Sequence, residues 1–575
     1  MKKPSCRWHK VLEKMKVIII GGVAGGMSAA TRLRRLREDA EITVYEMSQN
    51  VSYANCGLPY FVSNVISDRD ELLLQTPTSL WNRFRLDVRV NSKVTSIDPA
   101  AKTVQVHNLQ TGESYTDSYD KLVISTGAKP RRPNIPGVER ALPLRNVEDA
   151  DAVKLALGSP ADGAPSSTGA GKKAVVLGAG FIGIELAENL RELGVDVTIV
   201  QRSSRILSQF DSEMIQPLQE RLEQNGVQVL LNSQAASITP DSVMLVDGTV
   251  LPADVVLTAA GVEPDNWLAR EAGLRIGETG GLWVDDQQRT SDPNIYAAGD
   301  AVEKQGQLTG KSTLVPLANL ANRHGRLVAD SIAGLAPTAR PALATVIIGA
   351  FGLAAGITGL SEAAAKKAGV PHQVIHLHPS SHAGYYPGAK RISLKVLFEP
   401  TTGRILGAQA TGEDGADKRI DVIATAIFAG LTINDLMDLE LAYAPQFGSA
   451  KDAINQAGYV GNNVLSGNTP TIQWHELDSA LALSDGETVL VDVRTTAENV
   501  AGSIPGALNI PVDTLRDQLG SLAGKRVIVH CQVGQRGHTA VQILKGHGIS
   551  AVNLDGGYLT WKAGIESLAN HQTGK

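Results

Sequence analysis

The sequence predicts an α/β protein of several domains, two of which are built on nucleotide-binding βαβ units. Two apolar strands each lead into a glycine-rich turn and then a helix, which is the order of elements in a dinucleotide-binding unit. The composition agrees, because 57 glycines and only 4% aromatic residues suit parallel sheets joined by tight turns. A length of 575 residues exceeds what a single core accommodates, so we expect three or four domains.

The first βαβ unit follows a polar N-terminal extension. Residues 16–20 form an apolar strand, the turn reads Gly-Gly-Val-Ala-Gly-Gly from Gly21, and residues 27–37 form a helix. The N-terminus of this helix offers N–H groups to a pyrophosphate. The next strand, 41–45, ends at Glu46, whose carboxylate can accept hydrogen bonds from the ribose of an adenosine.

A second and complete version of the pattern follows. The strand 173–177 leads into Gly-Ala-Gly-Phe-Ile-Gly from Gly178, and a helix over 185–193 precedes the strand 196–200. Two bound nucleotides are therefore expected. Gln-Arg at 201–202 replaces the terminal acid, which removes repulsion of a 2′-phosphate and offers a guanidinium to pair with it. NADPH is then an option beside NADH; in the alternative interpretation the arginine is a solvated surface charge.

Two further motifs at strand ends flank the second unit. Ser-Thr-Gly-Ala-Lys-Pro begins at Ser125, and Tyr-Ala-Ala-Gly-Asp ends at Asp300. Either motif alone is equally consistent with an ordinary turn. Their order around the second βαβ unit predicts one nucleotide-binding domain that is interrupted by another. The stretch 158–171, rich in Gly, Ala, Ser and Pro, is predicted to be a flexible surface loop.

One cysteine lies where a redox centre is expected. Cys56, in Ser-Tyr-Ala-Asn-Cys-Gly-Leu-Pro-Tyr, follows the first βαβ unit closely and is one of only three cysteines in the chain. Flavoenzymes that exchange disulfides usually have a second thiol five positions earlier, and that position is Val51 here. Cys56 therefore needs a sulfur partner in a substrate, a cofactor or another domain. The alternative is a buried and inert cysteine.

The C-terminal part of the chain has a different pattern. From about residue 345 strands such as 391–398 alternate with helices, and residues 458–470 have the composition of a linker. In the α/β unit that follows, the strand 527–530 runs into Cys-Gln-Val-Gly-Gln-Arg, from Cys531 to Arg536. The N–H groups of such a loop converge and, with the helix dipole and the arginine, favour a thiolate and hold an anion. The loop could serve a persulfide or a phosphate.

Charge and hydropathy argue against several classes of protein. A net charge of −5 and a pI near 6.2 are atypical of proteins that bind nucleic acid or anionic membranes. No apolar run is long enough to span a bilayer, and the run after the basic N-terminus is too short for a signal peptide. Three widely spaced cysteines predict neither a disulfide framework nor a metal site. We expect a cytoplasmic protein with a disordered N-terminal extension over residues 1–14.

Together these motifs resemble the coenzyme A disulfide reductases and NAD(P)H-dependent persulfide (polysulfide) reductases, in the form fused to a C-terminal rhodanese domain. The resemblance extends from about Met15 to Ala569 and is most specific at Ser52–Cys56, Tyr385–Gly388, Ala442–Lys451 and the Cys531 loop. It implies two Rossmann-like domains for FAD and NAD(P)H, an α+β dimerisation domain and an α/β rhodanese domain. The implied boundaries are 15–140 and 260–344 (FAD), 141–259 (NAD(P)H), 345–460 (dimerisation), 461–470 (linker), 471–569 (rhodanese) and 570–575 (tail).

The resemblance also implies roles for individual residues. The catalytic set is Cys56 beside the flavin, Cys531 and Arg536 in the rhodanese loop, and Tyr386 (or Tyr385) and Tyr443, which come from the partner subunit in this family. The residues expected at FAD are Gly21, Gly22, Ala24, Gly25, Gly26, Glu46, Val94, Thr126, Gly127 and Asp300. Those expected at NAD(P)H are Gly178, Gly180, Gly183, Glu185, Gln201 and Arg202, and those at coenzyme A are Arg32, Arg35, Ser52, Asn55, Asn322 and Lys451.

Two residues and one segment can be compared with the sequence pattern of this family. Val23 replaces the middle glycine of the first turn, but the family shares this feature. Asn322 stands where some relatives have histidine, and residues 158–171 look like an insertion.

The implied reaction passes electrons from NAD(P)H through FAD to a disulfide between Cys56 and coenzyme A. A thiolate then attacks a persulfide, polysulfide or coenzyme A disulfide, Cys531 relays sulfane sulfur, and the protein is a homodimer. Two alternatives stay open. One is an NADH peroxidase or oxidase that works through a cysteine sulfenate, although such relatives carry a histidine just after the first turn and this chain has none between His9 and His107. The other is a sulfurtransferase or persulfide carrier whose flavin half mainly binds or senses.

Overall fold

The computed structural model describes residues 14–158, 169–482 and 487–573, which form two compact units. The predicted extension, apart from Lys14, and most of the predicted loop 158–171 lie outside the described residues. The described residues of the first unit lie within 1–132, 143–166 and 261–342, and those of the second within 133–142, 167–260 and 343–575.

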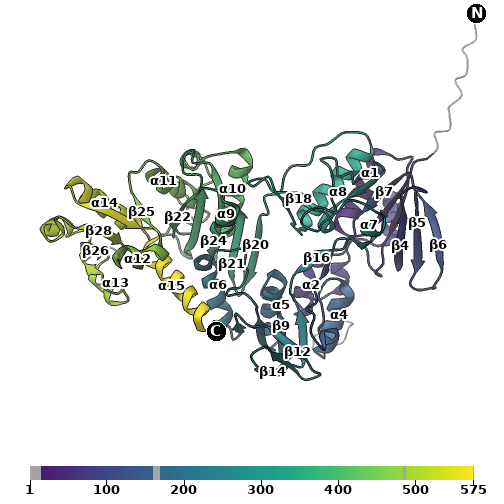
Figure 1. The fold of residues 1–575 in the computed structure, drawn as a ribbon, viewed down its shortest axis with the longest axis horizontal. Coiled ribbons are helices and arrows are strands. Elements are labelled where there is room, and N and C mark those ends of the chain that lie inside the picture. Colours follow the sequence, from purple (N-terminus) through teal and green to yellow (C-terminus); the bar gives the residue numbers. More distant parts are fainter. Residues whose placement is uncertain (1–13, 159–168, 483–486, 574–575) are drawn as a thin grey trace, which may run out of the picture. The chain divides into compact units, whose positions relative to one another are not determined.

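The first unit, which includes strand β7 in Figure 1, is built on a five-stranded parallel sheet with the order β17-β7-β1-β2-β3. Its strands are β1 (Lys16–Ile20), β2 (Glu41–Tyr45), β3 (Asp87–Arg89), β7 (Lys121–Ile124) and β17 (Ile295–Ala297). β1 pairs in parallel with β2 and β7 and is almost fully buried. A continuous apolar run becomes a central strand here because both faces of a parallel sheet are covered.

Two helices, α1 (Ala24–Leu36) and α8 (Ala318–Ile332), pack closely together in the first unit, and both contribute to the core on this sheet. A Cβ atom at Gly325 of α8 would lie 2.1 Å from the carbonyl oxygen of Gly25 in α1, so the contact requires glycine. The other elements of the unit are α2 (Leu58–Val62), α3 (Pro77–Phe84), the antiparallel strands β4 (Ser92–Asp98), β5 (Thr103–Asn108) and β6 (Ser114–Ser118), β8 (Ala128–Pro130), α4 (Val147–Ala156), β16 (Val262–Pro264), α7 (Trp267–Glu271), β18 (Lys304–Gln305) and β19 (Ser312–Thr313).

The second unit contains the second nucleotide-binding sheet, a parallel sheet in the order β11-β10-β9-β15. Its strands are β9 (Lys173–Leu177), β10 (Asp196–Val200), β11 (Gln228–Leu230) and β15 (Val255–Thr258), and its helices are α5 (Phe181–Glu192) and α6 (Ser212–Gln224). A small antiparallel sheet is formed by β12 (Ala235–Ile238), β13 (Ser242–Leu245) and β14 (Val250–Pro252). Helix α4, whose residues fall within the range predicted for the NAD(P)H domain, packs against α2 in the first unit.

An antiparallel sheet with the order β20-β21-β24-β23-β22 follows in the second unit. It comprises β20 (Val346–Ala350), β21 (Leu353–Gly359), β22 (Gln373–Leu377), β23 (Ile392–Phe398) and β24 (Ile405–Gly412), with helices α9 (Glu362–Ala368), α10 (Ala416–Ala429) and α11 (Ala453–Leu465). Together the parallel and antiparallel sheets confirm the predicted fold class of α/β and α+β domains.

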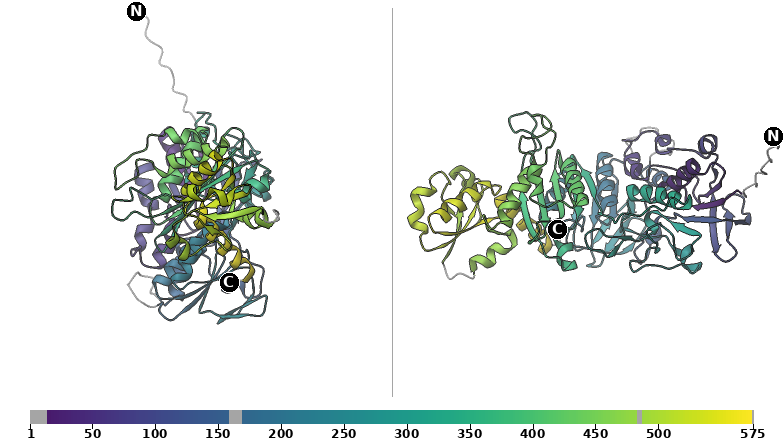
Figure 2. Two further views of the ribbon diagram at one scale, coloured as in Figure 1. Left: turned by 90° about the vertical axis from the view of Figure 1, so that its left-hand side faces the viewer. Right: turned by 90° about the horizontal axis from the view of Figure 1, so that it is seen from above.

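The last part of the second unit is a parallel sheet in the order β25-β29-β28-β26-β27. It comprises β25 (Thr471–Ile472), β26 (Thr488–Asp492), β27 (Leu508–Asn509), β28 (Arg526–His530) and β29 (Ser550–Leu554), with α12 (Leu477–Ala482), α13 (Thr496–Val500), α14 (Gln535–Gly546) and α15 (Gly557–Thr573). The right-hand view of Figure 2 shows this yellow part beside the green antiparallel sheet. Helix α15 also contacts α6 of the nucleotide-binding part.

Two predicted segments need correction. Residues 461–465 of the predicted linker are the end of helix α11, and residues 570–573 of the predicted tail continue α15. The glycines that suggested a linker serve close packing instead. A Cβ atom at Gly458 would lie 2.6 Å from the backbone nitrogen of Met437, and one at Gly461 would lie 2.1 Å from Ile433 Cγ1.

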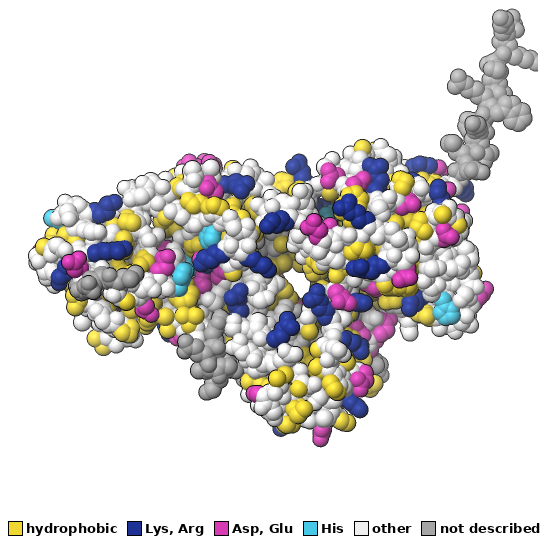
Figure 3. All heavy atoms as spheres, in the orientation of Figure 1, with side chains coloured by type: hydrophobic (Ala, Val, Ile, Leu, Met, Phe, Trp, Pro, Cys, Tyr) yellow, Lys and Arg dark blue, Asp and Glu magenta, His cyan; other side chains and the backbone are white. Residues whose placement is uncertain are grey.

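The surface carries both signs of charge. On the face shown in Figure 3, Lys and Arg side chains are interspersed with Asp and Glu side chains, which suits the modest net charge of −5. Among the described helices, none combines the length and the apolar character that crossing a membrane requires.

Replacement of Gly458 by alanine should lower the thermal unfolding midpoint, because the new Cβ meets a backbone atom that cannot move alone. Overpacking of this kind typically costs about 1–3 kcal/mol, which outweighs a gain of about 1 kcal/mol in helix propensity. Gly546→Ala is the matched control, because Gly546 ends helix α14 with no atom within 4 Å of the added Cβ. It should leave the midpoint unchanged or raise it. Equal shifts for both variants in a calorimetric scan would contradict the packing argument.

Candidate active sites

The first glycine turn brings together most of the residues predicted at FAD. Gly21 has a φ of +101°, and a Cβ atom at Gly26 would lie 1.9 Å from the Gly21 carbonyl oxygen, so helix α1 starts against the turn. The N–H of Gly22 donates to Glu46 Oε2 at 2.8 Å. Gly22, Ala24 and the other turn residues therefore lie at the carboxyl end of β1, beside the acid that ends β2. This is where a dinucleotide binds in such sheets.

Thr126 and Gly127 join the end of β7 to the segment that returns after the second nucleotide-binding unit. Thr126 Oγ1 donates to the Asp265 carbonyl at 2.5 Å, and the Asp265 N–H donates to the Gly127 carbonyl at 3.0 Å. These two hydrogen bonds thus connect the chain before the second nucleotide-binding unit with the chain that follows it. Val94, on β4, is buried in an apolar cluster.

Asp300 supplies the observation that tests whether these residues fit a flavin nucleotide. Its Oδ1 atom is buried and accepts no hydrogen bond from the described residues, and burial raises the pKa of the carboxyl group. Lys304 lies close by, donates to the Gly299 and Val302 carbonyls at 2.8 Å each, and has its pKa lowered to about 8 by burial. A buried carboxylate oxygen needs a donor, and a hydroxyl of a bound cofactor is one. The residues fit FAD.

The second turn repeats this geometry with an amide in place of the acid. A Cβ atom at Gly183 would lie 2.1 Å from the Gly178 carbonyl oxygen, whereas one at Gly180 would meet nothing within 4 Å, which leaves room for a phosphate. Gln201 Oε1 accepts from the Ala179 N–H at 3.0 Å, as Glu46 does from Gly22. These residues fit a nicotinamide dinucleotide.

Two further residues predicted at NAD(P)H follow the glycine turn at 178–183. Glu185 lies in helix α5 and is half-buried, and Arg202 is exposed after β10. Arg205, the next arginine after Arg202 in the sequence, has a buried Nε atom without a hydrogen-bond partner among the described residues.

Cys56 lies in a pocket of about 460 Å³ in the first unit. The thiol is exposed, and its Sγ lies 4.0 Å from Asn55 Oδ1. The pocket is lined by one face of α1, the 52–56 segment, residues of α3 and the start of α8. Four of the six residues predicted at coenzyme A belong to the lining: Arg35, Ser52, Asn55 and Asn322.

Backbone hydrogen bonds fix the segment that carries Cys56. The Ser52 N–H donates to the Gly22 carbonyl at 2.8 Å, and Ser52 has a φ of +50°. The Ala54 N–H donates to Leu72, and the Leu74 N–H donates to Ser52, at 2.8 and 3.0 Å. The cysteine segment is thus held between the first glycine turn and residues 72–74.

Two arginines line the Cys56 pocket. The Arg35 guanidinium lies over the Phe84 ring, 5.2 Å from its centroid, and Arg83 on α3 also lines the pocket. Sequence reasoning missed Arg83. The signal for a helix was present, because Thr76 caps α3, but no motif indicates that the helix faces Cys56. Arg32 is absent from the lining and pairs with Asp330 at 2.7 Å.

The tyrosines predicted to be catalytic lie in the second unit, on loops beside the antiparallel sheet. Tyr385 and Tyr443 are 75% and 50% exposed, and their hydroxyl oxygens lie 3.1 Å apart, which raises the pKa of Tyr385. Tyr386 instead meets the His382 ring edge-on at 5.7 Å between centroids. The structure therefore pairs Tyr385, rather than Tyr386, with Tyr443. Lys451 is exposed just before α11.

Cys531 is fully buried at the end of β28, and the loop after it turns at Gly534, with a φ of +92°. Arg536 donates to both carboxylate oxygens of Glu498, at 2.8 and 2.6 Å. This contact raises the pKa of Arg536 and lowers that of Glu498 to about 2. An anion that enters the loop meets an arginine that already has a carboxylate partner. His530, before the cysteine, is buried, and burial lowers its pKa to about 4.

Three protein families match this chain along its length. The model of pyridine nucleotide-disulphide oxidoreductases matches residues 15–325, that of their dimerisation domain residues 346–454, and that of rhodanese-like domains residues 476–564.

Individual proteins match over most of the chain. The coenzyme A disulfide reductase of Staphylococcus haemolyticus is 33% identical over 445 residues, which is 77% of this chain and 98% of that protein. The structure of reduced Bacillus anthracis CoADR-RHD superposes with a TM-score of 0.92 at 41% identity, over 96% of this chain and 99% of the other. An NAD-dependent persulfide reductase from A. fulgidus gives a TM-score of 0.87 at 35% identity, over 95% and 100% of the two chains.

Replacement of Asp300 by alanine should lower the amount of flavin that stays bound through gel filtration. A hydrogen bond to a charged group contributes about 1.5–3 kcal/mol, so flavin affinity should fall by about tenfold or more. Asp286→Ala, which removes an exposed acid from the same unit, is the control and should keep its flavin. An unchanged ratio of flavin to protein absorbance in Asp300→Ala would remove Asp300 from the cofactor site.

Proposed function

Since the chain belongs to the pyridine nucleotide-disulphide oxidoreductase family, in the coenzyme A disulfide reductase and persulfide reductase group with a rhodanese domain, we propose that Cys56 is its redox centre. The protein is an NAD(P)H-dependent flavoprotein disulfide or persulfide reductase of this type. Its proposed substrates are persulfides, polysulfide and coenzyme A disulfide, and its proposed thiol cofactor is coenzyme A.

The Cys56 pocket is the observation that carries this proposal. An exposed thiol lies in a pocket whose lining includes Arg35 and Arg83, with side-chain amides at Asn55 and Asn322. Guanidinium groups bind phosphates in bidentate geometry, and a volume of about 460 Å³ is typical of a small-molecule site. A phosphorylated thiol matches both features, because its phosphates meet the arginines while its sulfur meets Cys56.

The chemistry at Cys56 is thiol–disulfide exchange. FAD and NAD(P)H, when bound, supply two electrons to sulfur. Cys56 would be paired with coenzyme A in a disulfide, and reduction of that disulfide by these two electrons would leave the thiolates of Cys56 and of coenzyme A. A thiolate then attacks a sulfur atom of the substrate, and the substrate thiolate leaves. With a persulfide, one thiolate takes the outer sulfur, and the second thiolate then attacks the persulfide so formed, which restores the disulfide and releases the transferred sulfur as sulfide.

Tyr385 or Tyr386, together with Tyr443, is proposed to act in the partner subunit's site of a homodimer. The match to a dimerisation domain supports a homodimer, and the exposure of Tyr385 and Tyr443 leaves them available to another subunit. A phenolic hydroxyl within reach of a departing thiolate can position it or donate a proton to it. Lys451, which is exposed, is proposed to line the coenzyme A site.

Cys531 is proposed to carry sulfane sulfur as its own persulfide. The match to a rhodanese-like domain and the turn after Cys531 support this role. Because the two thiols are on one chain, their effective concentration toward each other is high.

The exposed Arg202 after Gln201 leaves both NADH and NADPH as electron donors in the proposal.

Cys56→Ser should abolish NAD(P)H consumption with polysulfide, coenzyme A persulfide and coenzyme A disulfide under anaerobic conditions, because the exchange needs its sulfur. Cys531→Ser should keep turnover with coenzyme A disulfide and lose any transfer of sulfane sulfur. Full sulfur transfer by Cys56→Ser, with negligible NAD(P)H consumption by the native protein, would instead make the chain a sulfurtransferase. Rapid Cys56-dependent turnover on peroxide alone would favour the sulfenate mechanism.

Arg83→Ala should weaken binding of coenzyme A by about tenfold at low salt, because one charge-assisted contact to phosphate is worth about 1.4 kcal/mol or more. Arg85→Ala is the matched control. Arg85 is exposed two residues further along, lies over the Trp81 ring and is absent from the pocket lining. Calorimetric titration should show the difference between the two variants shrinking as salt rises. Equal affinities at low salt would place the phosphates elsewhere.

A further inference from the structure

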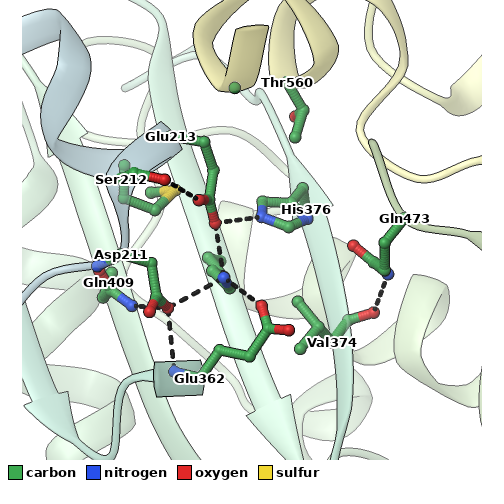
Figure 4. A network of polar contacts seen from close by, with 12 residues as sticks. Asp211, Ser212, Glu213, Glu362, Val374, His376, Gln409, Gln473 and Thr560 are labelled. Atoms are coloured by element: carbon green, nitrogen blue, oxygen red, sulfur yellow. Dashed lines mark hydrogen bonds and ion pairs between the residues drawn. The ribbon is translucent and has the colours of Figure 1, made fainter. Parts of the chain in front are cut away.

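A buried cluster of charged side chains joins three parts of the second unit (Figure 4). Lys395 on β23 is fully buried, and its ammonium group contacts Asp211, Glu213 and Glu362 at 2.9, 2.5 and 2.7 Å. The three carboxylates come from the start of α6 and of α9. Three such carboxylates can bind a cation, and here the Lys395 ammonium group is that cation.

His376 on β22 extends this cluster toward the C-terminal sheet. Its Nε2 lies 3.2 Å from Glu213 Oε1, and its Nδ1 lies 2.7 Å from Asp555 Oδ2. Its backbone N–H also donates to Asp555, at 3.2 Å. Carboxylates only accept hydrogen bonds, so both ring nitrogens must carry hydrogen and His376 is an imidazolium.

Asp555 lies next to the residues that support the Cys531 loop. It follows β29 directly, and the next residues pass beneath the loop: a Cβ atom at Gly557 would lie 2.4 Å from the Cys531 carbonyl oxygen. The N–H of Tyr558 donates to that same oxygen at 2.8 Å, and the N–H of Leu559 donates to Gln532 at 3.2 Å. Tyr558, whose N–H fixes the Cys531 carbonyl, therefore follows Asp555 of the ion pair by three positions.

We propose that the ion pair between His376 and Asp555 is a positioning device, by which the antiparallel sheet holds the Cys531 loop in its sulfur-accepting conformation. The functional part of this inference rests on the proposed role of Cys531 as a carrier of sulfane sulfur. The structural part is that loss of the charge on His376 loosens residues 531–537.

The charges around His376 determine the pH range over which its ion pair with Asp555 is present. Burial lowers the pKa of His376, but Asp555 and Glu213 outweigh this and raise it to about 9, against the opposing charge of Lys395. Asp211 and Glu362 face Lys395 from the other side, and His378 on the same segment is neutral, since burial lowers its pKa to about 3. The stabilisation is therefore fully present below the ordinary histidine pKa of about 6.5 and is lost as pH rises through about 9.

His376→Asn tests the inference, because the amide keeps a donor for Asp555 but never carries charge. His378→Asn is the matched control: His378 contacts Thr560 of α15 at 2.8 Å and Ser393 at 3.0 Å without titrating. Hydrogen exchange of peptides covering 531–537 is compared between each variant and the native full-length holoenzyme at the same pH. At pH 7 the exchange should be about three- to tenfold faster in His376→Asn, and at pH 10 the ratio should approach one. His378→Asn should show a constant ratio.

The rate of sulfur transfer gives a second readout. Cys531 takes the outer sulfur of thiosulfate with release of sulfite, and the persulfide passes that sulfur to cyanide as thiocyanate. Sulfur transfer by His376→Asn should be slower than that of the native protein at pH 7 and should approach the native rate at pH 10, in parallel with the hydrogen-exchange ratio. Cys56-dependent NAD(P)H consumption should stay at the native level, which would report that the variant is folded. A ratio that does not change with pH, or the same pH trend in His378→Asn, would overturn the positioning role. If the native protein transfers no sulfur, the proposed function of Cys531 fails, and the exchange data still decide the structural inference.

Discussion

The backbone of Gly22 connects the predicted FAD site to the segment of the proposed redox cysteine, Cys56. Its N–H donates to Glu46 at 2.8 Å, and its carbonyl accepts from Ser52 at 2.8 Å, so one residue fixes both the terminal acid and the segment that carries Cys56. A Cβ atom at Gly22 would lie 2.8 Å from Val51 Cγ2. Val51 is buried and occupies the position at which related enzymes place their second thiol. The packing that holds the turn thus uses a valine side chain, and no thiol, at this position.

Features that depend on a few consecutive residues could be predicted from the sequence. The turns beginning at Gly21 and Gly178 and the strands before them have the expected bounds, because steric limits on the backbone dictate both. Orientation between elements could not be predicted in this way. Arg83 reaches the Cys56 pocket because α3 presents that face, and Gly458 packs against Met437 rather than loosening the chain. Neither contact leaves a periodic or compositional signal.

Buried charges were equally out of reach of the sequence. Lys395, Glu213 and Asp555 look like surface residues in isolation, since such side chains are seldom buried unless paired. Their pairing joins residues 179 positions apart in the case of His376 and Asp555. Removing one member would leave its partner buried and uncompensated, so the cluster favours one arrangement of the three segments over others.

The two thiols differ in access, and this difference constrains how sulfur can move. Cys56 is exposed in a pocket and can meet a bulky thiol, whereas Cys531 is fully buried behind its loop and can meet only a small outer sulfur atom. A loop that were always open would expose a persulfide to water and to other thiols. A loop held by Asp555 through Tyr558 and Gly557 would keep that sulfur in one position for a small acceptor. In the proposed positioning role, the buried ion pair at His376 therefore fixes the geometry in which Cys531 takes up its sulfur and passes it on.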